Sequence, residues 1–320
     1  MRSINSEVVR RIDLSIIIPC YRSELFLYSN VEEIIAEIQK MINSKINTFE
    51  ILLIVDGSPD NTITVARLLE EKHKQVRVIE LNRNFGQHAA IFAGIYDAKM
   101  PWILTMDDDG QHPASEISTM LAEISPGVDV IYGSPRLEEH GLIRSFMSRQ
   151  AKYITYKALR IENARQISAF RLFRRTLLGS VDLIHLTNGV VDVVLHWSTT
   201  RFSSVEVDMQ KRKGGKSNYS ISGLFKFAAQ MITGYSTRPL KLATLIGFSS
   251  FIVSILAAVV VLIERILGKI KVPGYTTLVL LVLILGSIQL FALGIIGEYL
   301  GRIHEKTMGK PLFVIRHNLD

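Results

Sequence analysis

Short apolar runs alternate with helical patterns through the first third of this chain of 320 residues. The runs cover residues 14–18, 50–55, 76–81 and 102–106. Between them, apolar side chains recur at intervals of about three or four residues, which is typical of helices packed on a sheet. They are Val31, Ile34, Ile35, Ile38 and Ile42 in one segment, and Val65, Leu68 and Leu69 in the next. The alternation predicts repeated βαβ units and a parallel sheet.

A polar segment follows each of these runs. The segments are PCYRSE at 19–24, DGSPD at 56–60, NRNFGQH at 82–88 and DDDGQ at 107–111. In parallel sheets of this kind, ligands bind beyond the carboxyl ends of the strands. We therefore expect the four loops to converge on one crevice.

The last of these loops carries three consecutive aspartates, Asp107, Asp108 and Asp109. Alternate residues of an extended chain point the same way, so Asp107 and Asp109 are predicted to bind one hard cation, with Gln111 as a neutral ligand. Adjacent carboxylates repel one another unless a cation neutralises them. Bound Mg²⁺ or Mn²⁺ would stabilise a departing diphosphate. An acidic turn that caps the next helix is the alternative interpretation.

The same aspartates also resemble the aspartyl-phosphate loop of haloacid-dehalogenase-type phosphatases, in which the first Asp is a nucleophile. That loop normally follows the first strand and ends in Thr or Val. Here the loop follows at least the fourth predicted strand, and Gln111 stands at its end. No later Gly-Asp-x-x-x-Asp segment is present to supply the metal, so this hypothesis is disfavoured.

Two long apolar segments, 242–263 and 275–297, lie near the other end of the chain. Each has about 22 residues, which is enough to cross a bilayer core. The alternative interpretation is that the two segments are buried in the core of a soluble domain. The connector between the two segments has fewer basic residues than the sequences that flank the pair, which predicts that both termini are cytoplasmic. The connector holds Arg265, Lys269 and Lys271, and the flanks hold Lys226, Arg238, Lys241, Arg302, Lys306, Lys310 and Arg316.

The net charge of +7 suits nucleic acid, an anionic membrane surface or phosphate-bearing substrates. The chain has no zinc-ligand spacing, RNA-binding aromatic signature or heptad-bearing basic region, which disfavours nucleic acid. The single Cys20 excludes an intrachain disulfide and suits a reducing compartment, and we interpret it as a packing residue. The N-terminal segment contains only a short apolar run, so no secretory signal is expected.

Two further helices are predicted before the apolar segments. One, over 143–160, is basic, and the other, over 220–239, has an apolar face. The basic residues of the first helix either form a solvated charged face or contact anionic headgroups. The second either packs on the preceding α/β domain or lies in the membrane interface.

The segments SIIIPCYRSE, IVDGSPDNT, LNRNFGQHAAIFAG and MDDDGQHP resemble the successive motifs of glycosyltransferase family 2. They are most similar to its polyprenyl-phosphate branch, which includes dolichol-phosphate mannose synthases, bactoprenol glucosyltransferases and undecaprenyl-phosphate aminoarabinose transferases. GSPR at 133–136, SAFRLFRR at 168–175, KRKGGKSNYS at 211–220 and the paired apolar segments extend the likeness over nearly the whole chain. The resemblance implies a GT-A (Rossmann-like) α/β catalytic domain over 1–219, an interfacial helix over 220–239, a two-helix transmembrane anchor over 240–297 and a cytoplasmic tail over 298–320.

The resemblance also implies roles for single residues. The nucleoside contacts would be Pro19, Tyr21, Glu24 and Asp56, the donor diphosphate would lie beside Asp107 and Asp108, and the metal ligands would be Asp107, Asp109 and Gln111. Arg136 and Arg144 match basic positions that face phosphate, as a bidentate guanidinium can, although a surface ion pair is the alternative. Arg212, Lys216, Ser217 and Tyr219 would lie on a loop that closes near the acceptor, or that merely tethers the membrane helix.

Two departures from the family pattern concern Val55, where relatives commonly have Asp, and Asn218, where they often have Lys. The first puts one nucleoside contact in doubt, and Lys216 is a candidate to offset the second.

The implied reaction is inverting transfer of a sugar from a nucleotide-sugar donor to a polyprenyl phosphate, with undecaprenyl phosphate expected, at the cytoplasmic membrane face. A phosphate monoester is already ionised near neutral pH, so the reaction needs no general base. One alternative is another membrane acceptor, such as a glycolipid or a growing polysaccharide. The other is a membrane protein that binds nucleotide sugar without turnover. Family relatives also suggest a homo-oligomer.

Overall fold

The computed structural model describes residues 11–136, 166–179, 181–183, 186, 189–210 and 274–316, together with scattered residues between 245 and 267. The predicted helices over 143–160 and 220–239 lie outside the described residues. The chain forms two compact units. Met1–Tyr153, Ile161–Tyr219 and Lys310–Asp320 make up the first unit, and Ile154–Arg160 and Ser220–Gly309 make up the second.

The first unit is built on a mixed sheet. In its described part the sheet has seven strands in the order β3-β2-β1-β4-β6-β5-β7. They are β1 (Ile12–Cys20), β2 (Ile46–Val55), β3 (Val76–Glu80), β4 (Trp102–Thr105), β5 (Val130–Pro135), β6 (Arg171–Arg174) and β7 (Phe202–Val207). The first four are mutually parallel, which confirms the predicted parallel sheet over residues 14–106.

The other half of the sheet differs from the predicted pattern. Strand β6 runs antiparallel to both β4 and β5, and β7 pairs with β5 in parallel. Strand β6 has only four residues, and β7 reads FSSVEV with little apolar character. Because neither segment is a clear apolar run, the sequence pattern did not indicate these strands.

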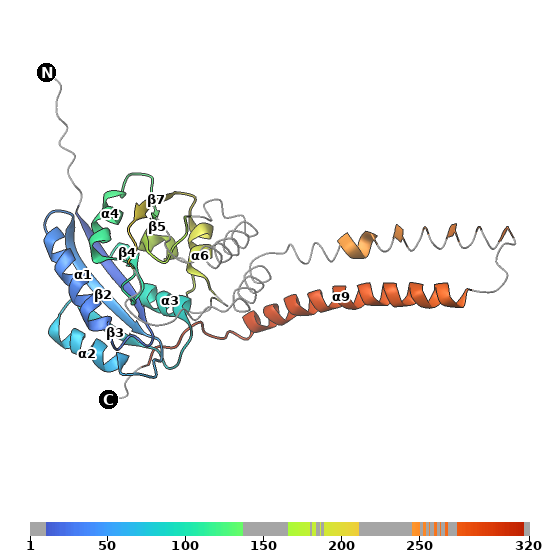
Figure 1. The fold of residues 1–320 in the computed structure, drawn as a ribbon, viewed down its shortest axis with the longest axis horizontal. Coiled ribbons are helices and arrows are strands. Elements are labelled where there is room, and N and C mark those ends of the chain that lie inside the picture. Colours follow the sequence, from blue (N-terminus) through green and yellow to red (C-terminus); the bar gives the residue numbers. More distant parts are fainter. Residues whose placement is uncertain are drawn as a thin grey trace, which may run out of the picture. The chain divides into compact units, whose positions relative to one another are not determined.

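Helices cover both faces of the sheet (Figure 1). Helices α1 (Leu27–Met41), α2 (Thr62–Lys72) and α4 (Ile117–Ala122) share one core cluster with the apolar side chains of β1. Helices α3 (Gln87–Asp97) and α6 (Val191–Ser198) lie on the opposite face, where Gly94 of α3 sits against Ile17 of β1. Two short 3₁₀ helices, η1 (Ala114–Glu116) and η2 (Arg175–Leu178), complete the first unit as described. Strand β1 is therefore buried on both sides, as its continuous apolar sequence indicates.

The predicted helix faces are confirmed except at Leu68; Val65 of α2 is partly buried against the core, and so is Ile42, which directly follows the end of α1. On α1, Val31, Ile34, Ile35 and Ile38 are all buried. On α2 the buried side chains are Thr62, Ala66 and Leu69, whereas Leu68 is 53% exposed. The prediction for Leu68 is wrong because one residue turns a helix by about 100°, which carries Leu68 off the narrow stripe that faces the core.

A buried ion pair joins the antiparallel half of the sheet to α6. Arg171 of β6 contacts Asp192 of α6 through Nε–Oδ1 at 2.6 Å and Nη2–Oδ2 at 2.9 Å, and both side chains are at most 5% exposed. The Tyr132 hydroxyl donates a third hydrogen bond to Asp192 at 3.2 Å. Burial by itself raises the pKa of Asp192, but the charge and hydrogen bonds of Arg171 outweigh it and leave the pKa below its usual value.

We expect Asp192→Ala to lower the free energy of unfolding by about 3–5 kcal/mol, because it leaves the Arg171 guanidinium buried and uncompensated. The double variant Arg171→Met/Asp192→Leu should lose far less, since it removes both charges. Lys40→Ala, which breaks the exposed Lys40–Glu37 pair, serves as the surface control. Thermal unfolding of the purified proteins measures all three. Equal losses for Asp192→Ala and the double variant would show that the pair's charges do not matter.

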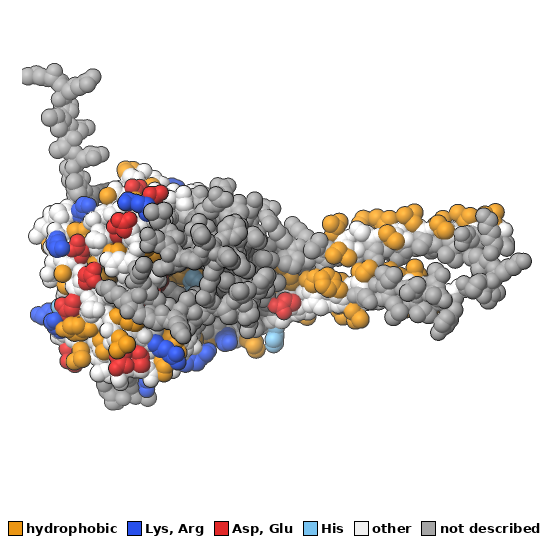
Figure 2. Space-filling model, viewed as in Figure 1, with side chains coloured by type: hydrophobic (Ala, Val, Ile, Leu, Met, Phe, Trp, Pro, Cys, Tyr) orange, Lys and Arg blue, Asp and Glu red, His pale blue; other side chains and the backbone are white. Residues whose placement is uncertain are grey.

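The second unit contains α9 (Tyr275–Thr307), which includes the second predicted apolar segment. Figure 2 shows exposed hydrophobic side chains along α9 and along the described residues of 245–267. On α9 they are Leu278, Leu281, Val282, Leu290, Phe291, Leu293, Ile296, Leu300 and Ile303. Over the residues that the structure describes, no helix has the combined length and apolar character that crossing a membrane requires.

Candidate active site

The four polar loops meet at the carboxyl edge of the parallel strands, as the sequence predicted. The backbone N–H of Tyr21 donates to Asp108 at 3.2 Å, and that of Arg22 donates to the Ser58 hydroxyl at 2.8 Å. Asp56 binds the loop after β3, and that loop in turn contacts Asp107. Each loop is thus hydrogen-bonded to at least one of the others.

Asp56 holds the loop after β3 against the end of β2. The residue is 3% exposed, and its carboxylate accepts hydrogen bonds from the backbone N–H groups of Phe85 at 2.7 Å and Gly86 at 2.8 Å. Burial raises the pKa of Asp56, and these two hydrogen bonds offset that rise only in part. Both carboxylate oxygens therefore already have a protein partner, which makes Asp56 an organiser of the crevice. Its predicted contact with a nucleoside stays a prediction.

The three aspartates after β4 have different partners. Asp107 accepts a hydrogen bond at 2.6 Å from the amide of Gln87, at the start of α3. Asp109 is 5% exposed and accepts one at 3.0 Å from the backbone N–H of Gln111. Asp108 instead contacts the loop after β1, where it accepts hydrogen bonds from Tyr21 and from the Ser23 hydroxyl. Asp107 and Asp108 thus contact different loops, but Asp108 and Asp109 lie in a turn after β4 rather than in the extended chain that the sequence argument assumed.

In this loop the pKa of Asp108 is shifted from its usual value. Burial raises the pKa of Asp108 to about 6, and the neighbouring charges of Asp107 and Asp109 add to the rise. Hydrogen bonds from Ser23 and Tyr21 act in the opposite direction. A small pocket beside the loop is bordered by Asn30, Asp107, Asp108, Gly110 and His112, among others. The loop is therefore a site of concentrated negative charge next to an opening.

The residue types fit a hard divalent cation. In the described part of the chain, no three His, Cys, Asp or Glu side chains form a metal-binding group. The predicted set, however, consists of two carboxylates and the amide of Gln111, all of them the oxygen donors that Mg²⁺ and Mn²⁺ prefer. Gln111 is held in place by its N–H bond to Asp109 and by its carbonyl, which accepts from Gln210 at 2.9 Å. A cation here would also relieve the repulsion by Asp107 and Asp109, which adds to the effect of burial on the pKa of Asp108.

Sequence reasoning missed two residues of the site, Gln87 and His112. His112 is 4% exposed, its ring stacks on Phe170 with centroids 5.1 Å apart, and its Nδ1 accepts from the Asp107 N–H at 3.3 Å. Burial lowers the pKa of His112 despite the nearby aspartates, which keeps the ring neutral as an acceptor. Both residues stand in the quoted motifs, but only the tertiary contacts reveal that they position Asp107.

Three of the predicted nucleoside contacts, Pro19, Tyr21 and Glu24, lie at the end of β1 and in the loop that follows it. Pro19 is buried in β1, and Tyr21 is 41% exposed. The Glu24 carboxylate accepts hydrogen bonds from the backbone and side-chain nitrogens of Asn61, at 3.2 and 3.0 Å. In this arrangement Glu24 links two loops, and its contact with a nucleoside stays a prediction.

Arg136 extends from the end of β5 and is the only basic residue of the predicted set within the described residues. Its guanidinium lies 3.6 Å from Glu206 and 3.5 Å from Asp208, and its side chain is 58% exposed. This is the surface ion pair named as the alternative, and the phosphate-facing role stays a prediction. Arg144, Arg212, Lys216, Ser217 and Tyr219 lie outside the described residues.

Gly57 allows the loops after β2 and β3 to approach closely. Its φ is +55°, and a Cβ at this position would lie 2.4 Å from the Arg83 carbonyl carbon. We expect Gly57→Ala to destabilise the protein by about 1–3 kcal/mol from backbone strain, with a further loss from the clash. Gly127 is the matched control, because its φ is also positive, +96°, but its Cβ would meet nothing. If thermal unfolding gives the two alanine variants the same loss, the close approach contributes nothing.

Comparison with known structures agrees with this fold. A crystal structure of glucosyl-3-phosphoglycerate synthase from Mycobacterium tuberculosis, in complex with Mn²⁺, UDP-glucose and phosphoglyceric acid, superposes with a TM-score of 0.50 at 15% identity. The match covers 69% of this chain and 78% of that one. At this identity it supports the fold alone, which is a GT-A-type α/β fold.

The family follows from the sequence. Residues 15–181, more than half of the chain, match glycosyl transferase family 2, and residues 238–303 match the GtrB C-terminal hairpin. The chain therefore belongs to glycosyl transferase family 2 and is a glycosyltransferase. The resemblance drawn from the motifs is confirmed.

The relatives match along nearly their full length. An uncharacterized glycosyltransferase of Synechocystis sp. is 28% identical, with 95% of both chains covered. The undecaprenyl-phosphate 4-deoxy-4-formamido-L-arabinose transferase of Proteus mirabilis is also 28% identical, with 95% of this chain and 93% of that one covered. Together with the hairpin, these relatives fit the polyprenyl-phosphate branch of the family.

Proposed function

We propose that this glycosyltransferase moves a sugar from a nucleotide-sugar donor to a polyprenyl phosphate, with inversion at the anomeric carbon. The observation that carries the proposal is the acidic loop after β4, which the loops after β1 and β3 contact directly. In this proposal the carboxylates of this loop lie beside the donor diphosphate. The name of the Proteus mirabilis relative supports undecaprenyl phosphate as the acceptor.

A divalent cation, Mg²⁺ or Mn²⁺, would be held by Asp107, Asp109 and Gln111. When bound, it supplies positive charge that stabilises a departing nucleoside diphosphate. The protein's own contribution is to orient these ligands, through Gln87 and His112 at Asp107 and through the Gln111 backbone at Asp109. Asp108, with its carboxylate turned to Ser23 and Tyr21, keeps the loop after β1 beside the diphosphate position.

The acceptor explains why the site needs no dedicated general base. A phosphate monoester is largely ionised at neutral pH and can attack the anomeric carbon directly. Catalysis then depends on positioning the acceptor phosphate and on stabilising the leaving group. In this proposal Arg136 and Arg144 contribute guanidinium groups that contact phosphate oxygens. One direct displacement inverts the anomeric centre.

The same proposal makes segments 242–263 and 275–297 the two spans of a membrane anchor, with the catalytic unit at the cytoplasmic face. Their length, the basic flanks and the match to the C-terminal hairpin support the anchor. The exposed apolar side chains on α9 also need a nonaqueous partner. A membrane location would bring a lipid-linked acceptor to the catalytic unit.

Replacing Asp109 by Ala should lower kcat/KM for sugar transfer by about a hundredfold or more, because several kcal/mol of leaving-group stabilisation depend on the metal ligands. Removal of divalent metal with EDTA should abolish transfer by the wild-type protein, and Mn²⁺ or Mg²⁺ should restore it. Glu71→Ala, an exposed acidic residue on α2, is the control. Transfer by Asp109→Ala at the wild-type rate would remove this residue from the mechanism.

The acceptor is tested with purified protein, a panel of nucleotide sugars and undecaprenyl phosphate in detergent. We expect metal-dependent release of nucleoside diphosphate only when the lipid phosphate is present, together with a sugar-linked lipid of inverted anomeric configuration. Transfer to a glycolipid but not to the lipid phosphate would replace the proposed acceptor. Binding of nucleotide sugar without transfer to any acceptor would indicate a protein without turnover.

A further inference from the structure

The C-terminal segment 312–316, called the tail here, belongs to the catalytic unit although it follows α9 in the chain. It pairs antiparallel with the end of β3 through a bridge between Ile315 and Leu81. The Asn82 N–H donates to the Val314 carbonyl at 3.0 Å, and the Arg316 N–H donates to the Glu80 carbonyl at 2.7 Å. The tail thus covers the end of the strand that comes first in the sheet order.

Side chains anchor the tail on both sides of this bridge. Phe313 is 4% exposed and packs edge to face on Tyr96 of α3, with ring centroids 6.1 Å apart. Leu312 lies close to Gly189, whose Cβ would be 3.4 Å from the leucine Cδ2. The Arg316 guanidinium forms an ion pair with Glu80 at 2.7 Å. Since an aromatic side chain is buried and two backbone hydrogen bonds are made, the tail is a specifically docked segment.

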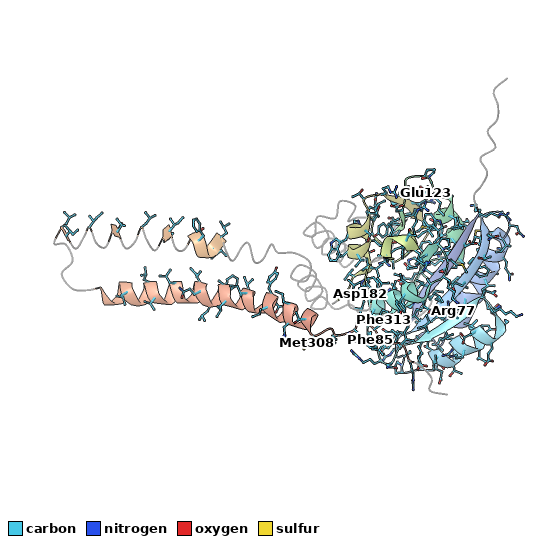
Figure 3. All side chains as sticks on the ribbon, turned by 180° about the vertical axis from the view of Figure 1, so that it is seen from behind. Arg77, Phe85, Glu123, Asp182, Met308 and Phe313 are labelled. Carbon is cyan, nitrogen blue, oxygen red and sulfur yellow. The ribbon has the colours of Figure 1, made fainter. Side chains whose placement is uncertain are left out.

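Asn82, whose N–H donates to the tail, is the first residue of the donor-site loop, which we define as residues 82–87. Figure 3 shows Phe85 of this loop and Phe313 of the tail in the same region of the catalytic unit. The loop contains no helix or strand before α3 begins at Gln87. Its far end binds Asp56 through Phe85 and Gly86 and binds Asp107 through Gln87. The loop is therefore fastened at one end by the tail and at the other by two aspartates of the crevice.

We propose that the tail is a positioning element of the donor site, which holds the 82–87 loop in the conformation that binds the nucleotide sugar. The inference rests on the proposed function only for the identity of the ligand. Without the tail, the Asn82 N–H and the Glu80 carbonyl lose their partners, and the loop gains conformations in which Phe85 and Gly86 leave Asp56. Nucleotide binding then requires a conformation that is less populated, so the affinity for the nucleotide falls by the same factor as that population. The chemical step, once the donor is bound, is unaffected.

The test compares the full-length protein with a truncation after Gly309, which leaves α9 intact, and with Arg316→Pro, which removes one backbone donor and the ion pair. Val314→Ala is the matched control, because the exposed Val314 contributes its carbonyl rather than its side chain. Hydrogen exchange reports the amides of residues 82, 85 and 86. We expect about tenfold faster exchange there in the truncation and in Arg316→Pro, with unchanged protection of β1 and β4 as the evidence of folding.

Function is measured as nucleotide-sugar affinity and as the separate values of donor KM and kcat. We expect the truncation to raise donor Kd and KM by about tenfold while kcat at saturating donor changes less than about twofold. A synthetic peptide of residues 310–316 added to the truncated protein should restore protection and affinity. A general loss of structure would not be reversed by this peptide.

Two outcomes overturn the inference: unchanged exchange at residues 82, 85 and 86 after truncation, or unchanged donor affinity despite faster exchange. Its failure is distinguishable from that of the proposed function. If the wild-type protein binds a nucleotide sugar but transfers nothing to polyprenyl phosphate, the proposed function fails, whereas weaker binding by the truncation still supports the tail's role.

Discussion

The pairing of β1 with β2 on one side and β4 on the other is the constraint on which the site depends. Cys20 is in register with Val55, and Ile17 is in register with Thr105. The loops that follow these strands therefore leave the sheet at one edge, within hydrogen-bonding reach of each other. The two faces of β1 pack against different helices, so a slip by one residue would exchange the apolar side chains that fit each layer.

Carboxylates crowded at this edge have unequal environments. Asp56 and Asp108 are each held by two donors of the protein itself, and burial raises the pKa of both. These two aspartates join neighbouring loops. Asp107 and Asp109 accept hydrogen bonds from Gln87 and from the Gln111 backbone instead, and hydrogen bonds of this kind orient the ligands of a cation. One short acidic sequence thereby supplies both the scaffold and the proposed chemistry.

The sheet edge at β3 links the site to the C-terminal part of the chain. An edge strand exposes unpaired backbone groups, and here the tail satisfies two of them just before the donor-site loop begins. Because the tail follows α9 closely in sequence, the segment proposed as an anchor and the loop beside Asp56 are connected through only a few residues. In the proposed role, retention of the tail is a requirement of the donor site.

The sequence by itself determined the parallel half of the sheet, because its strands are long apolar runs and its helices carry regular buried stripes. It also determined the four loops and the acidic cluster, since motif order places them after successive strands. Only the tertiary structure decided that β6 enters antiparallel between β4 and β5, since four residues carry no periodic signal. Contacts between distant residues likewise decided the roles of Gln87 and His112, the exposure of Leu68 and the docking of the tail. Such contacts depend on the packing of segments far apart in the chain, and local residue patterns do not encode them.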